Sequence, residues 1–200
     1  MATSRPNKSI SAFKAALVGG GARPNLFEVR LATLPGGISW DGDTFQYMCK
    51  AAQLPASVIA NIDVPFRGRI FKVAGDRTIE TWSVTVINDE SFKLRNAFEE
   101  WMQLIAKLDT NIGAVSPEAY MVDADVYQLG RGSKPGSKDN TGSANAVLKQ
   151  YKMEQIFPTS LSAIDLSYDT GDTIEEFTVE FQVQSFVPYG GVGQASITQG

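Results

Sequence analysis

The fold is decided by residues 64–108, which read VPFRGRIFKVAGDRTIETWSVTVINDESFKLRNAFEEWMQLIAKL. Residues 66–73 and 78–87 are rich in β-branched and aromatic side chains, which strands prefer. The Gly75-Asp76 pair between them favours a turn. The pattern therefore predicts a β-hairpin with its turn at residues 74–77.

A helix is predicted directly after this hairpin. Asn88 can act as its N-cap, with Asp89 and Glu90 in the first turn near the positive end of the helix dipole. Apolar residues then recur at alternating spacings of four and three, which is typical of one buried helix face. We expect that face to consist of Leu94, Phe98, Trp101, Ile105 and Leu108.

The rest of the chain is dominated by strand patterns joined by turns. Strands are predicted over residues 25–33, 44–50, 120–129, 147–157, 163–168 and 175–187. Pro158 is expected to end the strand over residues 147–157, and residues 51–61 are expected to form a connector. The last strand alternates most clearly. Its apolar side chains are Phe177, Val179, Phe181 and Val183, and its polar ones are Glu176, Thr178, Glu180, Gln182 and Gln184. The expected fold is mainly β, an antiparallel β-sandwich or rolled barrel with one packed α-helix.

The chain is predicted to contain a single main domain with additions at both ends. Residues 1–24 form an N-terminal arm, in which a short helix over 11–18 places Phe13 and Leu17 on one side. Residues 25–189 form the β domain. Within it, residues 130–146 are rich in glycine, serine and asparagine and are predicted to be a flexible loop, and residues 190–200 form a C-terminal tail.

Composition excludes several kinds of site. The 200 residues carry a net charge of −4, which argues against a dedicated nucleic-acid binder, since such domains are usually basic. There is no histidine and only one cysteine, Cys49, so no Ser-His-Asp triad, Cys/His zinc site or internal disulfide can form. Asp41 and Asp43 could begin a calcium loop, but the rest of that pattern is missing. We expect a buried Cys49, and no catalytic residue, metal or cofactor.

Neither a signal peptide nor a membrane-spanning segment is predicted. Residues 15–18 are too few for the apolar region of a signal peptide, and no stretch approaches the ~20 apolar residues that span a bilayer. We therefore expect synthesis in the cytoplasm without membrane insertion.

Several short motifs follow one another along the chain. They are ARPNLF at residues 22–27, CKAAQLP at 49–55, VAGDRT at 73–78 with WSVTV at 82–86 and NDE at 88–90, and FPTS at 157–160 leading into LSY at 166–168. In this order they resemble the tail tube proteins of contractile-tailed bacteriophages of the T-even type. The similarity extends from residue 22 to about residue 187. The loop over residues 130–146 is longer than is usual in this family.

The resemblance implies a structural subunit that is not an enzyme. Six copies would form a ring, and rings would stack into a hollow tube that carries genome DNA inside a contractile sheath. The sheath, the baseplate and the tail terminator would be its partners, the virion tail its location, and the host cytoplasm its place of synthesis. The alternative within this architecture is the tube of a type VI secretion system or another contractile injection system.

Two sets of residues are candidates for the functions of such a subunit. Since DNA must slide through a tube without sticking, the polar face of the last strand is predicted to line the lumen, with Asp123 and Asp125 as further candidates. Contacts between subunits are predicted for the hairpin region and the arm. The residues concerned are Val58, Ile59, Ile62, Phe66, Arg67, Arg69, Asp76, Arg77, Phe13 and Leu17.

Two other function classes stay open. Acid–base catalysis could use the carboxylate pairs Glu99-Glu100, Asp123-Asp125 or Asp169-Asp172, although solvated faces and turns explain these pairs better. A nucleic-acid-binding oligomer could use the basic residues of the hairpin, which are Arg67, Arg69, Lys72 and Arg77.

Overall fold

The computed structural model describes residues 9–17, 21–31, 33–110, 112–130, 147–169 and 171–189. The chain splits into two compact units. One comprises Met1–Glu28, Tyr127–Gln150 and Pro188–Gly200, and the other comprises Val29–Val126 and Tyr151–Val187. The predicted tail over residues 190–200 and all but Gly130 of the predicted loop lie outside the described residues.

The largest element is a 7-stranded sheet. Its strand order is β1 (Phe27–Leu31), β6 (Val122–Leu129), β7 (Val147–Leu161), β8 (Glu176–Gln182), β5 (Trp82–Ile87) and β2 (Cys49–Ala52), and β9 (Ser185–Tyr189) also pairs with β7. The β2–β5, β5–β8 and β7–β8 pairs are antiparallel. This arrangement confirms the mainly β, antiparallel class that the sequence predicts.

The core lies between one face of this sheet and helix α3 (Lys93–Ile105). Val84 lies directly opposite Val179, and the flanking pairs are Trp82 with Phe181 and Val86 with Phe177. All six of these side chains are buried. From the helix, Leu94, Phe98 and Trp101 are buried as predicted. Each large apolar side chain buried in this way contributes roughly 1.5–3 kcal/mol to stability.

The start and the end of α3 differ from the prediction. The helix begins at Lys93 without a side-chain cap, after Phe92 in the left-handed region at φ 53°. Asn88 is buried instead, and its amide Nδ2 donates to Glu175 Oε2 at 3.0 Å. The predicted N-cap is therefore wrong. At the other end Leu108 lies beyond the helix and is 89% exposed, so its assignment to the buried face is also wrong.

A second helix, α2 (Gly42–Met48), occupies most of the segment predicted as a strand over residues 44–50. Asp41 caps it, since one carboxylate oxygen accepts the Thr44 backbone N–H at 3.1 Å. Thr44 donates to this carboxylate from its side chain as well as from its backbone. The two hydrogen bonds, the side-chain one most of all, lower the pKa of Asp41. Phe45 then packs its ring against Trp40 and Phe98. The sequence suggested alternation, but the cap at Asp41 and the burial of Phe45 favour a helix.

Other predicted boundaries also differ from those in the structure. Strand β7 continues through Pro158 to Leu161, with a register irregularity between Pro158 and Ser160. Residues 163–168 are not a strand, and the predicted strand over residues 175–187 is divided into β8 and β9. Short 3-10 turns, η2 and η3, occupy Pro35–Gly37 and Pro117–Ala119.

The predicted arm contains helix α1 (Ile10–Ala16), capped by Ser9, whose hydroxyl accepts the Ala12 N–H at 3.2 Å. This confirms the short helix that the sequence indicates before Gly19. None of the helices in the described part of the chain is long and apolar enough to cross a membrane.

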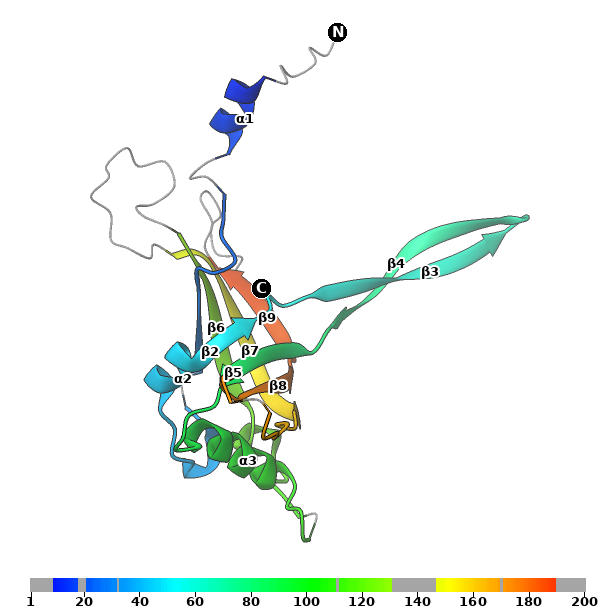
Figure 1. Ribbon diagram of the computed structural model, residues 1–200. Coiled ribbons are helices and arrows are strands. Elements are labelled where there is room, and N and C mark those ends of the chain that lie inside the picture. Colours follow the sequence, from blue (N-terminus) through cyan, green and yellow to red (C-terminus); the bar gives the residue numbers. More distant parts are fainter. Residues whose placement is uncertain are drawn as a thin grey trace. The chain divides into compact units, whose positions relative to one another are not determined.

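A separate two-stranded sheet is formed by β3 (Ser57–Phe66) and β4 (Arg69–Ile79). Its turn lies at Arg67 and Gly68, which both have positive φ, 48° and 79°. The predicted turn at residues 74–77 is therefore wrong, as is the connector over residues 51–61, because β3 begins at Ser57. This hairpin extends away from strands β2, β5 and β8 of the same unit (Figure 1).

Candidate assembly surfaces

One face of the β3–β4 hairpin is apolar along most of its length. Ile62 lies opposite Val73, Val64 opposite Phe71, and Phe66 opposite Arg69. Because side chains alternate along a strand, these residues share one face. Its apolar members are 42–67% exposed, although hydrophobic side chains at strand positions normally face a core. We call this set of Ile62, Val64, Phe66, Phe71 and Val73 the hairpin's apolar face.

The opposite face of the hairpin is mixed. Lys72 lies opposite Asp63 with its ammonium 3.8 Å from the carboxylate, and Asn61 donates its amide to Asp63 at 2.9 Å. Exposed pairs of this kind contribute at most about 1 kcal/mol, so they orient the strands without creating a core. Ile70 is the one large apolar side chain at this end of the face, and it is exposed too.

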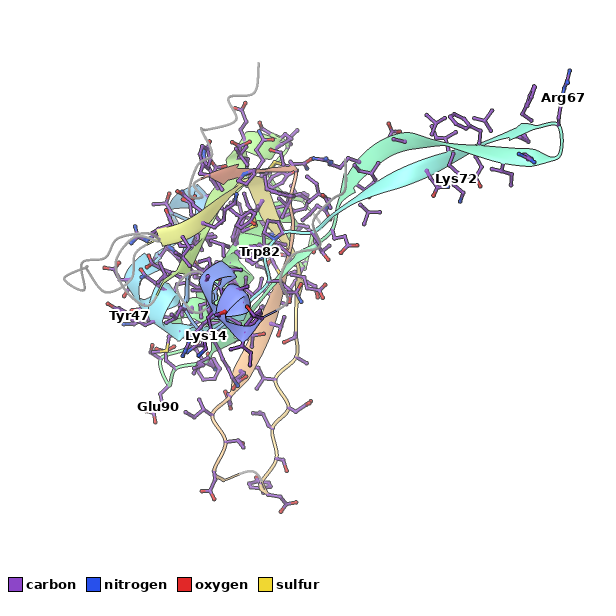
Figure 2. The ribbon with its side chains drawn as sticks, turned by 90° about the horizontal axis from the view of Figure 1, so that it is seen from above. Lys14, Tyr47, Arg67, Lys72, Trp82 and Glu90 are labelled. Atoms are coloured by element: carbon purple, nitrogen blue, oxygen red, sulfur yellow. The ribbon has the colours of Figure 1, made fainter. Side chains whose placement is uncertain are left out.

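The tip of the hairpin is basic. Arg67 lies at the turn, and its guanidinium stands 5.4 Å from the centre of the Phe66 ring. Figure 2 shows Arg67 at the end of the hairpin and Lys72 further along it. Residues 64–73 contain Arg67, Arg69 and Lys72 but no acidic residue. The tip therefore combines positive charge with exposed aromatic rings.

Nearer its base the hairpin contains a bulge. The register shifts between Ile59 and Asn61, where Ile59 pairs with Arg77 and Asn61 pairs with Ala74. A Cβ at Gly75 would lie 3.1 Å from the Ala60 carbonyl oxygen and 3.2 Å from the Ile62 side chain. The close approach of the two strands, rather than a turn, thus favours glycine at this position.

All the residues predicted from sequence to contact other subunits lie on exposed elements. Val58, Ile59, Asp76 and Arg77 lie toward the hairpin base, and Ile62, Phe66, Arg67 and Arg69 toward its tip. Phe13 and Leu17 are exposed at α1. Val64, Phe71 and Val73 lie within the hairpin region expected from sequence to contact other subunits, but they were not named individually because the turn was predicted at residues 74–77. A turn at Arg67-Gly68 reveals the alternation that assigns them to one face.

The polar side chains of β8 form a second candidate surface. Glu176, Thr178, Glu180 and Gln182 alternate with buried residues, so they occupy the face opposite the core. On neighbouring β5, Ser83 lies opposite Glu180 and Thr85 opposite Thr178, with the threonine hydroxyls 3.2 Å apart. Gln184 follows the end of β8 and is exposed. The predicted polar face is thus continuous over two strands.

Lysines neutralise part of the negative charge on the polar side chains of this sheet. Lys50 forms an ion pair with Glu176. Lys152 lies 3.0 Å from Asp123, and the Gln155 N–H donates to the same carboxylate at 3.1 Å. Burial works to raise the pKa of Asp123, but these bonds outweigh it and hold that pKa below its usual value. No ion pair to Glu180 lies among the described residues, so no lysine or arginine there offsets its carboxylate.

The described residues offer little for chemistry. They contain no group of three or more histidine, cysteine or acidic side chains that could hold a metal ion. Glu99 of the carboxylate pair on α3 is paired with Arg95, whose Nε lies 2.7 Å from it. Cys49 is buried, as predicted, and burial raises its thiol pKa to about 12, so it stays protonated at neutral pH.

Comparisons with solved structures agree with this fold. A chain in the baseplate of the anti-feeding prophage matches with a TM-score of 0.59 at 10% identity, over 85% of this chain and 96% of that one. A chain in the sheath–tube complex of the PVC extracellular contractile injection system matches with a TM-score of 0.51 at 13% identity, over 92% and 99%. At these identities the likeness concerns the fold alone.

Sequence comparisons are more specific. Tail tube protein gp19 of Enterobacteria phage T4 is 35% identical over 158 residues, which are 79% of this chain and 86% of that protein. The tail tube protein of Serratia phage KSP90 is 26% identical over 128 residues, 64% of this chain and 66% of that protein. The family model described as "Phage tail tube protein" matches residues 22–188. The chain therefore belongs to the phage tail tube protein family, whose members are structural proteins and not enzymes.

Proposed function

We propose that six copies of this chain form a ring, and that rings stack into the hollow tube of a contractile phage tail. Family membership supports the tube, and the fold supports the ring. The baseplate structure with the related fold was 6-fold symmetrised, and the related PVC chain comes from a complex of tube and sheath. A tube of this kind is a component of the virion tail, made in the host cytoplasm and assembled from identical subunits.

The observation that carries the proposal is the exposed apolar face of the hairpin. Ten extended residues span roughly 33 Å, far enough to reach an adjacent subunit. A two-stranded ribbon is at best marginally stable by itself, and contiguous exposed apolar surface marks interaction sites. Burial of this face against neighbouring copies would stabilise both the hairpin and the tube, at about 25 cal/mol for each Å² buried.

The arm supplies a second contact between subunits in this proposal. Helix α1 has only 7 residues, and isolated helices shorter than about 12 residues are marginal in water. Ile10, Phe13 and Leu17 are all exposed. Packing of these side chains against another subunit would order the helix, as segments that fold on binding do.

The polar face of β8 is proposed to line the lumen. A tube that conducts DNA needs a wall that does not collect phosphates, because each lysine or arginine contact adds affinity for the duplex. Glu180 and the uncharged Thr178, Gln182 and Gln184 suit such a wall. Glu176 and Asp123 are already paired with lysines, and Asp125 lies on the same polar face as Asp123. Glu180 is thus the residue expected to repel DNA most.

Sheath, baseplate and terminator proteins are the partners implied by this position in the tail. The alternative is a tube subunit of another contractile injection system, because that is where the related folds occur. The identity of 35% to a phage tube protein favours the phage tail. A nucleic-acid-binding oligomer is disfavoured, since Lys72, one of its four candidate residues, is paired with Asp63.

Electron microscopy of the purified full-length protein tests the proposal. We expect six-fold rings and hollow tubes, with a repeat that corresponds to one ring. A cryo-EM map of the tube would also place β8. A protein that stays monomeric at all concentrations and with added tail initiation complexes would contradict the proposal, and so would rings of another symmetry.

A further inference from the structure

We infer that the hairpin of one copy docks on residues 163–169 and 171–176 of a second copy, with the Arg67 side chain entering the acidic cavity found there. We call these residues the acidic segment. The inference rests on the proposed function, because it names the partner surface through which stacked subunits would hold each other.

The first argument is charge complementarity. The acidic segment contains Asp165, Asp169, Asp172, Glu175 and Glu176, and no lysine or arginine occurs anywhere after Lys152 in the chain. The hairpin tip has the opposite composition, with cations and no acid over residues 64–73. No ion pair to Asp165, Asp169 or Asp172 lies among the described residues. Complementary charges of this kind steer association and fix its register.

The second argument is the cavity. A cavity of about 370 Å³ lies between the two ends of the segment, lined by residues 163–167 and 173–176. Three acidic residues, Asp165, Glu175 and Glu176, are among those that line it. Glu175 already accepts from Asn88, and Glu176 pairs with Lys50, but Asp165 has no such partner among the described residues. The planar guanidinium of an arginine suits this lining, because it can donate to two carboxylate oxygens at once.

The third argument is the apolar surface on both sides. Leu166, Tyr168 and Ile174 in the acidic segment are strongly exposed, as are Phe66 and Phe71 near the hairpin tip. Aromatic and aliphatic side chains around a desolvated arginine are the usual composition of an interface centre. The two surfaces are therefore complementary, because both expose apolar side chains and they carry opposite charges.

The docking partner is a second copy rather than the same one. The hairpin extends away from the strands of its own unit, and Arg67 lies at its far end (Figure 2). The acidic segment connects β7 to β8, which lies beside β5 in that unit's sheet. Each subunit in a stack would then give its hairpin to one neighbour and accept a hairpin from the other. This is a head-to-tail contact, and such contacts propagate into a filament.

Charge reversal with mixing tests the inference. The tip variant carries Arg67→Glu and Arg69→Glu, and the segment variant carries Asp165→Lys and Asp169→Lys. Each alone should need about tenfold more protein, or more, to form tubes, because like charges would meet at every contact. Mixed in equal amounts, the two should assemble again, since each tip then meets a segment of opposite charge. Light scattering and electron microscopy measure assembly, and circular dichroism checks that each variant is folded.

Matched controls separate this contact from net charge. Lys93→Glu with Lys107→Glu changes the charge as the tip variant does, and Glu100→Lys with Glu118→Lys changes it as the segment variant does. All four control residues are exposed and lie outside both surfaces. Reversal variants that assemble as well as their controls would overturn the docking, and so would a mixture that fails to assemble. If the unaltered protein forms no tubes, it is the proposed function that fails.

A disulfide experiment detects the contact directly in assembled tubes, without a comparison of how strongly variants assemble. Copies with Arg67→Cys are mixed with copies with Asp165→Cys, assembled and oxidised. The native Cys49 is buried and protonated, so it should contribute little background. Dimers that link the two different variants support the docking. Intact tubes without such dimers would overturn it.

Discussion

At the scale of single residues, the aromatic cluster around α3 determines the stability of the core. Trp101 is fully buried, its ring lies 5.9 Å from Phe181, and its indole N–H donates to the Tyr120 carbonyl at 2.8 Å. The other two tryptophans, Trp40 and Trp82, also donate to backbone carbonyls, those of Leu31 and Gln53. Each indole thus fills apolar space without leaving a buried donor unpaired.

Trp101→Ala should therefore lower the free energy of unfolding by about 3–5 kcal/mol, through lost burial and the cavity left behind. Denaturant unfolding of the monomer measures the loss. Leu108→Ala is the matched control, because Leu108 continues the same sequence pattern but is exposed, and it should change stability by less than about 0.5 kcal/mol. Equal effects of the two substitutions would mean that Trp101 does not occupy the core.

Asp123 provides a prediction on pH. Its folded-state pKa is lowered, so its ion pair stabilises the fold above the unfolded-state pKa, about 3.9, and is lost as the pH falls through the folded value. Asp123→Asn should lower Tm slightly at pH 7, by an amount equivalent to at most about 1 kcal/mol, since the carboxylate is half exposed. The difference should shrink in acid, as the pH falls through the lowered folded-state pKa, and vanish once both side chains are neutral.

Thermal unfolding at pH 7 and in acid checks this expectation. Asp172→Asn is the control, because Asp172 is exposed and has no ion pair among the described residues, and it should have little effect at either pH. An Asp123→Asn difference that persists unchanged in acid would show that the side chain acts through its shape and not through its charge.

At the scale of elements, the hairpin and the sheet are stabilised in different ways. The sheet buries one face against α3, while the hairpin relies on strand propensity, backbone pairing and a few exposed polar contacts. The hairpin can therefore change without unfolding the core. This separation makes it possible to test assembly independently of folding.

Gly75→Val tests the hairpin in this way. Its branched side chain would press on the Ala60 carbonyl and the Ile62 side chain, so the two strands must move apart at the bulge. We expect Tm of the monomer to change little and tube formation to weaken strongly, as measured by sedimentation. Ala74→Val, at an exposed position one residue away, is the control and should assemble normally. A large loss of Tm with Gly75→Val would place the hairpin in the folding core.

At the scale of the whole molecule, the proposed tube turns one polar sheet face into the wall of a channel. Glu180→Lys should leave ring and tube formation intact, because the side chain is exposed and opposite Ser83. DNA ejection from particles should slow, and more so at low salt, since the new cations bind phosphates along the path. Time-resolved ejection with a DNA-binding dye measures the rate.

Glu118→Lys is the control for ejection, since it changes the net charge equally at an exposed position away from β8. If both variants eject DNA at the unaltered rate while a tube map shows Glu180 on the outer surface, the assignment of β8 to the lumen is wrong.

The sequence by itself determined what depends on local periodicity. The alternation in β8 and the buried residues Leu94, Phe98 and Trp101 followed from periods of two and about 3.6 residues, because each period assigns side chains to one face whatever the rest of the chain does. The family resemblance also followed from short motifs in a fixed order, and it led to the residues predicted to contact other subunits. The sequence did not reveal which of those residues share one face of the hairpin.

Tertiary structure decided the choices between local signals of similar strength. Arg67-Gly68 and Gly75-Asp76 can each make a turn, and the pairing of β3 with β4 over the whole hairpin selects the first. Asn88 suits an N-cap, but its partner Glu175 lies 87 residues away. Likewise the charge of the polar face depends on Lys50 and Lys152, which only the sheet brings beside Glu176 and Asp123. Such contacts join residues distant in sequence, and no local pattern encodes them.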